Sequence, residues 1–160
     1  MDTEFNLSHY PKYATVLNCG VAKLGDGAST VGATALGVDG NAADAKACYT
    51  AGAFGGMVES LIMNTNDTAA VNVLVYELNG STIIPKGIVN IPANSGNIGT
   101  VAAVNALAGI GVTLIGFPIN ANGKAYIPLR PNSQLKVATL GAMTANKCLW
   151  ASADGVDYIA

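Results

Sequence analysis

Val71-Asn72-Val73-Leu74-Val75-Tyr76-Glu77-Leu78, followed directly by Asn79-Gly80, is the stretch that decides the fold of this chain. The run is short, mostly apolar and almost uncharged, as a strand is. Asn-Gly is the strongest short-range signal for a β-hairpin, because both residues accept the positive φ of a type I′ turn. Two further strand-like runs follow at residues 81–85 and 87–92. This part of the chain therefore predicts a hairpin within an all-β scaffold.

Similar short runs recur between turn formers on both sides of this hairpin. We expect strands at residues 13–17, 30–38, 46–50, 57–63, 112–115, 125–129, 134–140 and 147–151. Residues 100–107 fit a strand or a short helix, and residues 42–47 fit a helical turn or a loop running into the next strand. Residues 20–27 look like a glycine-spaced link, and Asp154-Gly155 looks like a terminal turn. About nine or ten strands without a convincing long helix predict an antiparallel β-sandwich of jelly-roll type.

The first twelve residues are polar and carry isolated aromatic side chains. Pro11 restricts Tyr10 to an extended conformation. We interpret residues 1–12 as an N-terminal arm and residues 13–160 as a single β-sandwich domain. If the arm docks on a partner, its anchors are Phe5, His9 and Tyr10, together with Tyr13 where the domain begins.

Charged residues make up only 11% of the chain, where about 25% is usual for soluble domains. Such a surface is poorly defended against association. It is either covered in the working state, by copies of the chain or by a partner, or it belongs to a monomer rich in Asn, Thr and Ser. The net charge of −2 and the scattered lysines give no footprint for nucleic acid. We expect no membrane span, because the apolar stretch at residues 101–117 is short and broken by glycines, and no signal peptide.

The chain offers little reactive chemistry. Its single histidine, His9, lies in the arm, and its acidic residues are dispersed. We therefore expect no enzyme, no cofactor and no metal site; residues 154–157 resemble a fragment of a calcium loop that lacks its other oxygen ligands. Cys19, Cys48 and Cys148 have no C-x-x-C spacing and read as small core hydrophobes, with a disulfide between two of them left open. Trp150 is expected in the core beside Cys148.

Three segments resemble small proteins encoded in the structural gene clusters of tailed phages. Residues 49–61 resemble the pattern T-A-G-x-x-G-x-x-V-x-x-L, and residues 73–81 resemble the hairpin L-x-V-Y-x-x-x-G-S. Residues 118–129 with 135–137 resemble the segment P-L-D-A-N-G-x-x-x-L-P-x-G-x-x-L-K-V. The resemblance covers roughly residues 45–158.

This resemblance implies a virion structural protein: a capsid decoration or cement protein that binds the phage head shell and bridges neighbouring capsid subunits. It implies the major capsid protein as partner, a homo-oligomer with a trimer favoured, and a location on the capsid surface after synthesis in the host cytoplasm. It carries over no catalytic residue. The alternatives are a tail, fibre or baseplate component and a carbohydrate-binding β-sandwich module, for which Trp150 and Tyr126 would supply the aromatic platform.

Overall fold

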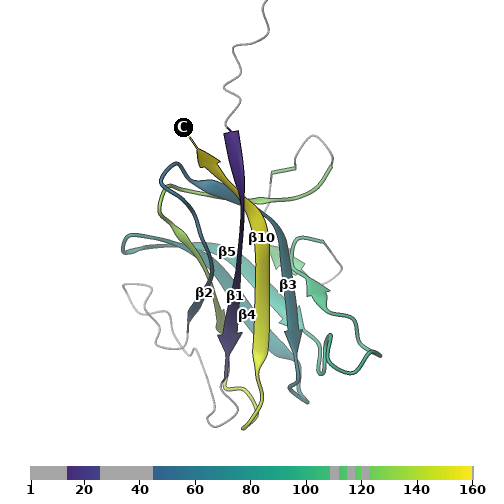
Figure 1. The fold of residues 1–160 in the computed structure, drawn as a ribbon. Helices are drawn as coiled ribbons and strands as arrows, with labels where there is room; N and C mark the ends of the chain where they lie inside the picture. The colour runs from purple at the N-terminus through teal and green to yellow at the C-terminus, as the bar shows by residue number, and fades with distance from the viewer. Residues whose placement is uncertain (1–13, 26–44, 109–111, 115–117, 120–122, 160) are drawn as a thin grey trace, which may run out of the picture.

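The computed structural model describes residues 14–25, 45–108, 112–114, 118–119 and 123–159, and every regular element within them is a β-strand. The strands form two antiparallel sheets that lie against each other (Figure 1), which confirms the prediction of an all-β antiparallel sandwich. Their bounds are β1 Ala14–Leu24, β2 Lys46–Thr50, β3 Gly56–Thr65, β4 Val71–Asn79, β5 Thr82–Ile91, β6 Val104–Asn105, β7 Val112–Leu114, β8 Ile127–Leu129, β9 Gln134–Thr139 and β10 Leu149–Ile159.

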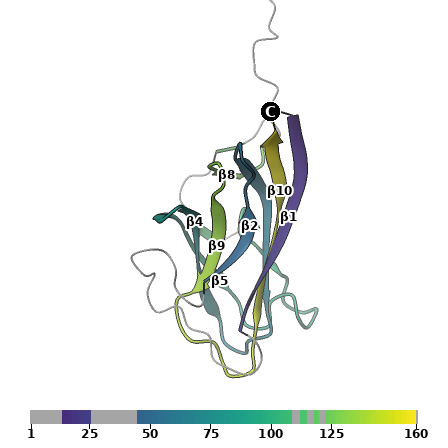
Figure 2. The same ribbon diagram turned by 60° about the vertical axis from the view of Figure 1, so that its left-hand side comes forward.

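The first sheet, called here the β1 sheet, has the order β1-β10-β3-β6, and β8 also pairs with β3. The second, the β4 sheet, has the order β2-β9-β4-β5-β7. Figure 2 shows β1 and β10 on the right and β9 and β4 on the left. The pairs are nested, since β1 pairs with β10, β2 with β9, β3 with β8 and β4 with β5. Nested pairs of this kind arise when one long hairpin folds over on itself. The jelly-roll subtype itself stays a prediction.

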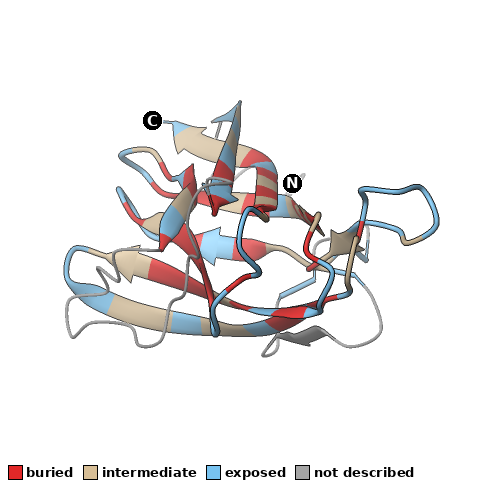
Figure 3. Cartoon of the chain, turned by 90° about the horizontal axis from the view of Figure 1, so that it is seen from below, coloured by how far each residue is buried: buried red, intermediate tan, exposed pale blue. Residues whose placement is uncertain are grey.

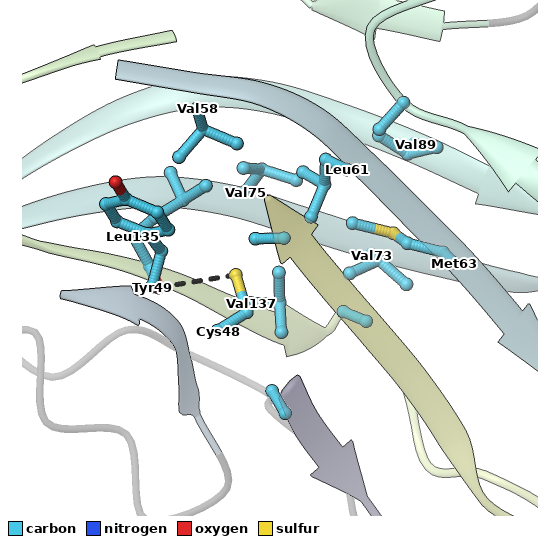
Figure 4. Close-up of a cluster of buried hydrophobic side chains, with 14 of the residues drawn as sticks. Cys48, Tyr49, Val58, Leu61, Met63, Val73, Val75, Val89, Leu135 and Val137 are labelled. Atoms are coloured by element: carbon cyan, nitrogen blue, oxygen red, sulfur yellow. Dashed lines mark hydrogen bonds between the residues drawn. The ribbon is translucent and has the colours of Figure 1, made fainter. Parts of the chain in front are cut away.

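The core lies between the sheets because alternate side chains of each strand point inward. Val58, Leu61 and Met63 of β3 are buried against Val73 and Val75 of β4 (Figure 4). Figure 3 shows buried segments on the strands of both layers. On the inward side of β10, Leu149, Ala151 and Ala153 are fully buried.

The predicted hairpin is present, but its turn lies one residue further along the chain. Asn79 pairs with Thr82, so the two loop residues are Gly80 and Ser81. Gly80 has a φ of 60°, and Asn79 and Ser81 are not among the non-glycine residues with positive φ. A glycine at the first loop position is the type II′ pattern rather than the predicted type I′.

Two glycines predicted to break strands instead lie inside them. Gly20, predicted to open a link, is in β1, and Gly155, predicted to form a terminal turn, is in β10. A Cβ on Gly20 would lie 2.3 Å from the Cys48 carbonyl oxygen, and one on Gly155 would lie 2.1 Å from the Met57 carbonyl oxygen. Each glycine therefore marks a close approach of two backbones, and at Gly155 the pairing with β3 also shifts by a β-bulge.

Other boundaries also differ from expectation. The runs predicted at residues 81–85 and 87–92 form the single strand β5, which carries a bulge at Lys86 because Val75 pairs with Gly87 and Tyr76 with Pro85. Only Val104–Asn105 is strand within residues 100–107. At residues 46–50 the strand alternative is correct. The strand predicted at residues 30–38 lies outside the described residues.

Candidate interaction surface

The four predicted interaction residues, Phe5, His9, Tyr10 and Tyr13, lie outside the described residues. The described residues present a different exposed surface. It lies directly after the arm in sequence, on the strand that begins at Ala14.

The edge strand β1 exposes aliphatic side chains to solvent. Its inward side carries Ala22 and Leu24, which are 3% and 0% exposed. Its outward side carries Leu17 and Val21, which are 87% and 66% exposed. An outward side of this kind is normally polar, so Leu17 and Val21 depart from the usual alternation.

The neighbouring strand β10 continues this surface with one apolar and two polar residues. Leu17 pairs with Val156 of β10, and Val21 pairs with Ser152. Between them the exposed Cys19 pairs with Asp154. We call the outward-facing side chains of these three cross-strand pairs the β1 face: Leu17, Cys19, Val21, Ser152, Asp154 and Val156.

The β1 face borders a shallow depression of about 590 Å³, whose lining includes Leu17, Cys19, Asp154, Glu59 of β3 and Lys124. A second depression of about 470 Å³ adjoins it and shares Glu59 and Lys124. Because carboxylates and an ammonium group are mixed around the first depression, neither sign of charge dominates. The surface suits an apolar, weakly charged partner better than a phosphate or a metal ion.

A hydrogen-bonded group holds β1 in place beside the β4 sheet. The Asp157 carboxylate of β10 accepts a hydrogen bond from the Tyr49 hydroxyl at 2.9 Å and another from Asn18 Nδ2 at 2.8 Å. Asn18 Nδ2 also donates to the Thr50 carbonyl oxygen at 2.9 Å. Burial and the Asp157 carboxylate raise the pKa of Tyr49, so its hydroxyl stays a proton donor. These bonds tie β1, β2 and β10 together and fix the N-terminal half of the β1 face.

Glu77 forms a buried ionic group at one end of the sandwich. Its carboxylate is fully buried and lies 3.0 Å from both Lys86 Nζ and Arg130 Nη1. It also accepts a hydrogen bond from the Arg130 backbone nitrogen at 3.0 Å. Burial raises the pKa of Glu77, but the hydrogen bonds and the positive charge of Lys86 outweigh burial and leave the pKa below its ordinary value. The bulge in β5 places Lys86 at this contact.

The buried carboxylate of Asp67 likewise stabilises the fold, here by hydrogen bonds between connecting loops. Its carboxylate accepts hydrogen bonds from the Thr144 hydroxyl at 2.6 Å, the Thr144 nitrogen at 2.8 Å and the Ala69 nitrogen at 3.0 Å. Burial raises the pKa of Asp67, and these hydrogen bonds more than offset it, so the net pKa is lowered. Asp67 and Glu77 are thus explained by structural bonds, with no reacting group needed.

The described residues form no cluster of potential metal ligands. Within the described ranges, no group of three or more His, Cys, Asp or Glu side chains is placed to hold a metal ion. Residues 154–157, which resemble a calcium loop, form part of strand β10 instead of a loop.

The three cysteines are unpaired. Cys48 and Cys148 are buried as predicted, and burial raises the pKa of Cys48 to about 12. The Cys48 thiol donates to the Leu135 carbonyl oxygen at 3.4 Å. The prediction is wrong for Cys19, which is exposed, because it occupies an outward position of the edge strand.

Trp150 was expected in the core, and this is also wrong. It stands in β10 between the buried Leu149 and Ala151, so its side chain points to the opposite, outward side and is half-buried. Tyr126 is half-buried as well. In the part of the chain that the structure describes, no helix is long and apolar enough to cross a membrane.

Comparisons with known proteins give one structural similarity. No family model matches the chain, and no curated protein matches it. Among solved structures, a chain described as "Cyanophage Pam1 capsid asymmetric unit" is 13% identical, with a TM-score of 0.47. The similarity covers 92% of this chain and 86% of that one. At this level it does not assign a function.

Proposed function

We propose that this chain is a virion structural protein, a cement or decoration protein that binds the head shell of a tailed phage and bridges neighbouring capsid subunits. Its partner is then the major capsid protein, and its place is the capsid surface. The trimer implied by the sequence resemblance is part of this proposal, and the chain acts through contact and not through catalysis.

The observation that carries the proposal is the β1 face. Leu17 and Val21 stand in solvent on a regular strand, in a chain with only 11% charged residues. Burying such aliphatic surface against a neighbour is favourable, about 25 cal/mol for each Å² removed from water. A protein whose role is adhesion in many copies needs this kind of surface, and weakly charged copies can crowd together without repulsion.

The phage-like sequence motifs have a common structural role in the fold. Residues 49–61 and 118–129 meet where β3 pairs with β8, since Gly56 lies opposite Leu129 and Val58 lies opposite Ile127. Residues 73–81 and 135–137 meet where β4 pairs with β9, since Val75 lies opposite Val137. The segments that carry the resemblance are therefore neighbours in the fold, which supports treating them as parts of one pattern.

Attachment to shells tests the proposal and the role of the arm. We expect the chain lacking residues 1–12 to remain folded but to bind undecorated heads more weakly, because Phe5, His9 and Tyr10 are lost as anchors. Binding is measured by co-sedimentation with purified heads, and circular dichroism checks the fold. Equal binding of the truncated and full-length chains would remove the arm from the account.

Location on the particle separates the proposal from its main alternative. Gold-labelled antibody against the chain should decorate heads in negative-stain images of purified phage. Label on the tail or baseplate would favour the tail-component reading, and particles without any label would overturn both.

A further inference from the structure

We propose that β1 pairs edge to edge with β1 of a second copy, antiparallel and across a two-fold axis that passes beside Cys19. The contact joins the β1 faces of two molecules. Edge-to-edge pairing makes the two β1 faces continuous and leaves their outward surface free to meet the shell. In a particle coated with trimers, this contact would link adjacent trimers.

The first observation is that β1 is an open edge. It ends the strand order of its sheet, so among the described residues it has β10 as its single ladder neighbour. It has 11 residues, all in unbroken register with β10. The strand β2 crosses its inward side, where the Cys48 carbonyl faces Gly20, and so does not extend the sheet. A long, regular edge strand is a ready template for pairing with another strand.

The second observation is that the sequence of β1 itself carries little of the usual protection of an edge. Natural edge strands are blunted by charges, prolines, bulges or shortness. Lys23 is the one charged residue between Ala14 and Leu24, and the strand contains no proline. Two copies of this strand can therefore approach without repulsion along most of its length.

The third observation is self-complementarity, which selects both the partner and the register. In an antiparallel pair centred on Cys19, Leu17 lies opposite Val21 of the second copy, and this pair occurs twice. Lys23 then lies opposite Thr15 of the second copy, so the two lysines stay apart. Cross-strand aliphatic pairs stabilise a sheet, and like charges directly opposite destabilise it.

Other registers fit less well. A shift by one residue would place the outward side chains of one copy opposite the inward side chains of the other, which breaks the continuity of the face. A shift by two residues toward the C-terminus would place Lys23 against Leu17 and would bury an ammonium group beside an aliphatic side chain. The register centred on Cys19 alone pairs both exposed aliphatic residues.

The Cys19 thiol can report on this contact, because in the proposed register it faces Cys19 of the second copy. Facing residues of an antiparallel pair have Cα atoms about 4.5–5.5 Å apart, within the range of about 4.4–6.8 Å for a disulfide. We expect diamide, which takes up the two electrons and two protons of the thiols, to convert the purified chain to a Cys19-linked dimer. The matched control carries Cys19→Ser and Ser81→Cys, which moves the exposed thiol to the tip of the β4–β5 hairpin. Dimer should form about tenfold faster, or more, in the natural chain than in this control.

A pair of charged substitutions tests the register without a chemical cross-link. Leu17→Asp should place a carboxylate opposite Val21 of the second copy and weaken self-association about tenfold or more, measured by sedimentation equilibrium. Adding Val21→Lys to this variant creates two Asp–Lys pairs in the proposed register and should restore much of the association. Both positions are exposed, so the variants should keep the circular dichroism spectrum of the natural chain.

Equal dimer formation at Cys19 and at Ser81→Cys would overturn the proposal. A double variant that associates no better than Leu17→Asp alone would overturn the register. Neither result bears on whether the chain binds phage heads, so failure of this contact and failure of the proposed function are distinguishable.

Discussion

Glu77 shows how single residues hold this weakly charged fold together. Its buried carboxylate joins Lys86 of β5 to Arg130, which lies 53 residues from Glu77 along the chain. A buried carboxylate of this kind is costly unless it is fully paired, and here it has an ion-pair partner on two sides and a backbone nitrogen besides. Glu77 stabilises the fold by connecting β4, β5 and the segment after β8.

Removing this charge should destabilise the fold in a pH-dependent way. Glu77→Gln leaves Lys86 and Arg130 without their counter-ion and should cost about 3 kcal/mol of unfolding free energy at neutral pH. Because the folded-state pKa of Glu77 lies below its ordinary value of 4.5, its contribution is complete above that value and is lost as the pH falls through the folded-state pKa. Urea unfolding at about pH 7 and about pH 3 should show a gap between natural chain and variant that narrows in acid.

The exposed Glu59 provides the matched control. Glu59→Gln should leave the unfolding free energy nearly unchanged at both pH values, since exposed charges contribute little. A Glu77→Gln variant as stable as Glu59→Gln at neutral pH would contradict the structural role given to the buried group.

At the scale of elements, the glycines inside strands set how closely the strands approach. Gly155 lies at the bulge where β10 meets β3, and a Cβ there would lie 2.1 Å from one backbone atom and 2.9 Å from another. Backbone cannot move aside as a flexible side chain can. Gly155→Ala should therefore destabilise the protein by about 1–3 kcal/mol, measured by thermal unfolding.

Gly141 is the corresponding control, because a Cβ on it would meet nothing within 4 Å. Gly141→Ala should be neutral or slightly stabilising, since it reduces the freedom of the unfolded chain. Equal melting temperatures for the two alanine variants would show that the close contact at Gly155 does not constrain the sheet.

The β4–β5 hairpin and the strand glycines show which features of the fold can be predicted from local sequence and which cannot. Residues 71–78 with Asn79-Gly80 predict the hairpin because strand and turn signals there are local. Gly20 and Gly155 were misplaced because the carbonyls that they approach belong to distant strands. The exposure of Leu17, Val21 and Cys19 was hidden for a related reason: which side of β1 faces the core depends on where β2 and β10 lie. Local sequence predicted only the aromatic residues of the arm and Tyr13 as interaction residues, and these lie outside the described residues.

For the whole molecule, we propose that the β1 face is covered in the working particle. A sandwich with few charges and a line of exposed aliphatic residues on one sheet gains free energy when that sheet meets a neighbour. Cys19 reports on this directly, since it lies within the β1 face, while Cys48 and Cys148 are buried in the domain itself.

The most direct test is the rate at which a maleimide labels Cys19, read by mass spectrometry of the peptide, in the dilute isolated chain and in intact purified phage particles. The account predicts rapid labelling of the isolated chain, strong protection in the particle, and recovery of labelling when the chain is released. Labelling at the same rate in both states, or purified particles that do not contain the chain, would contradict it.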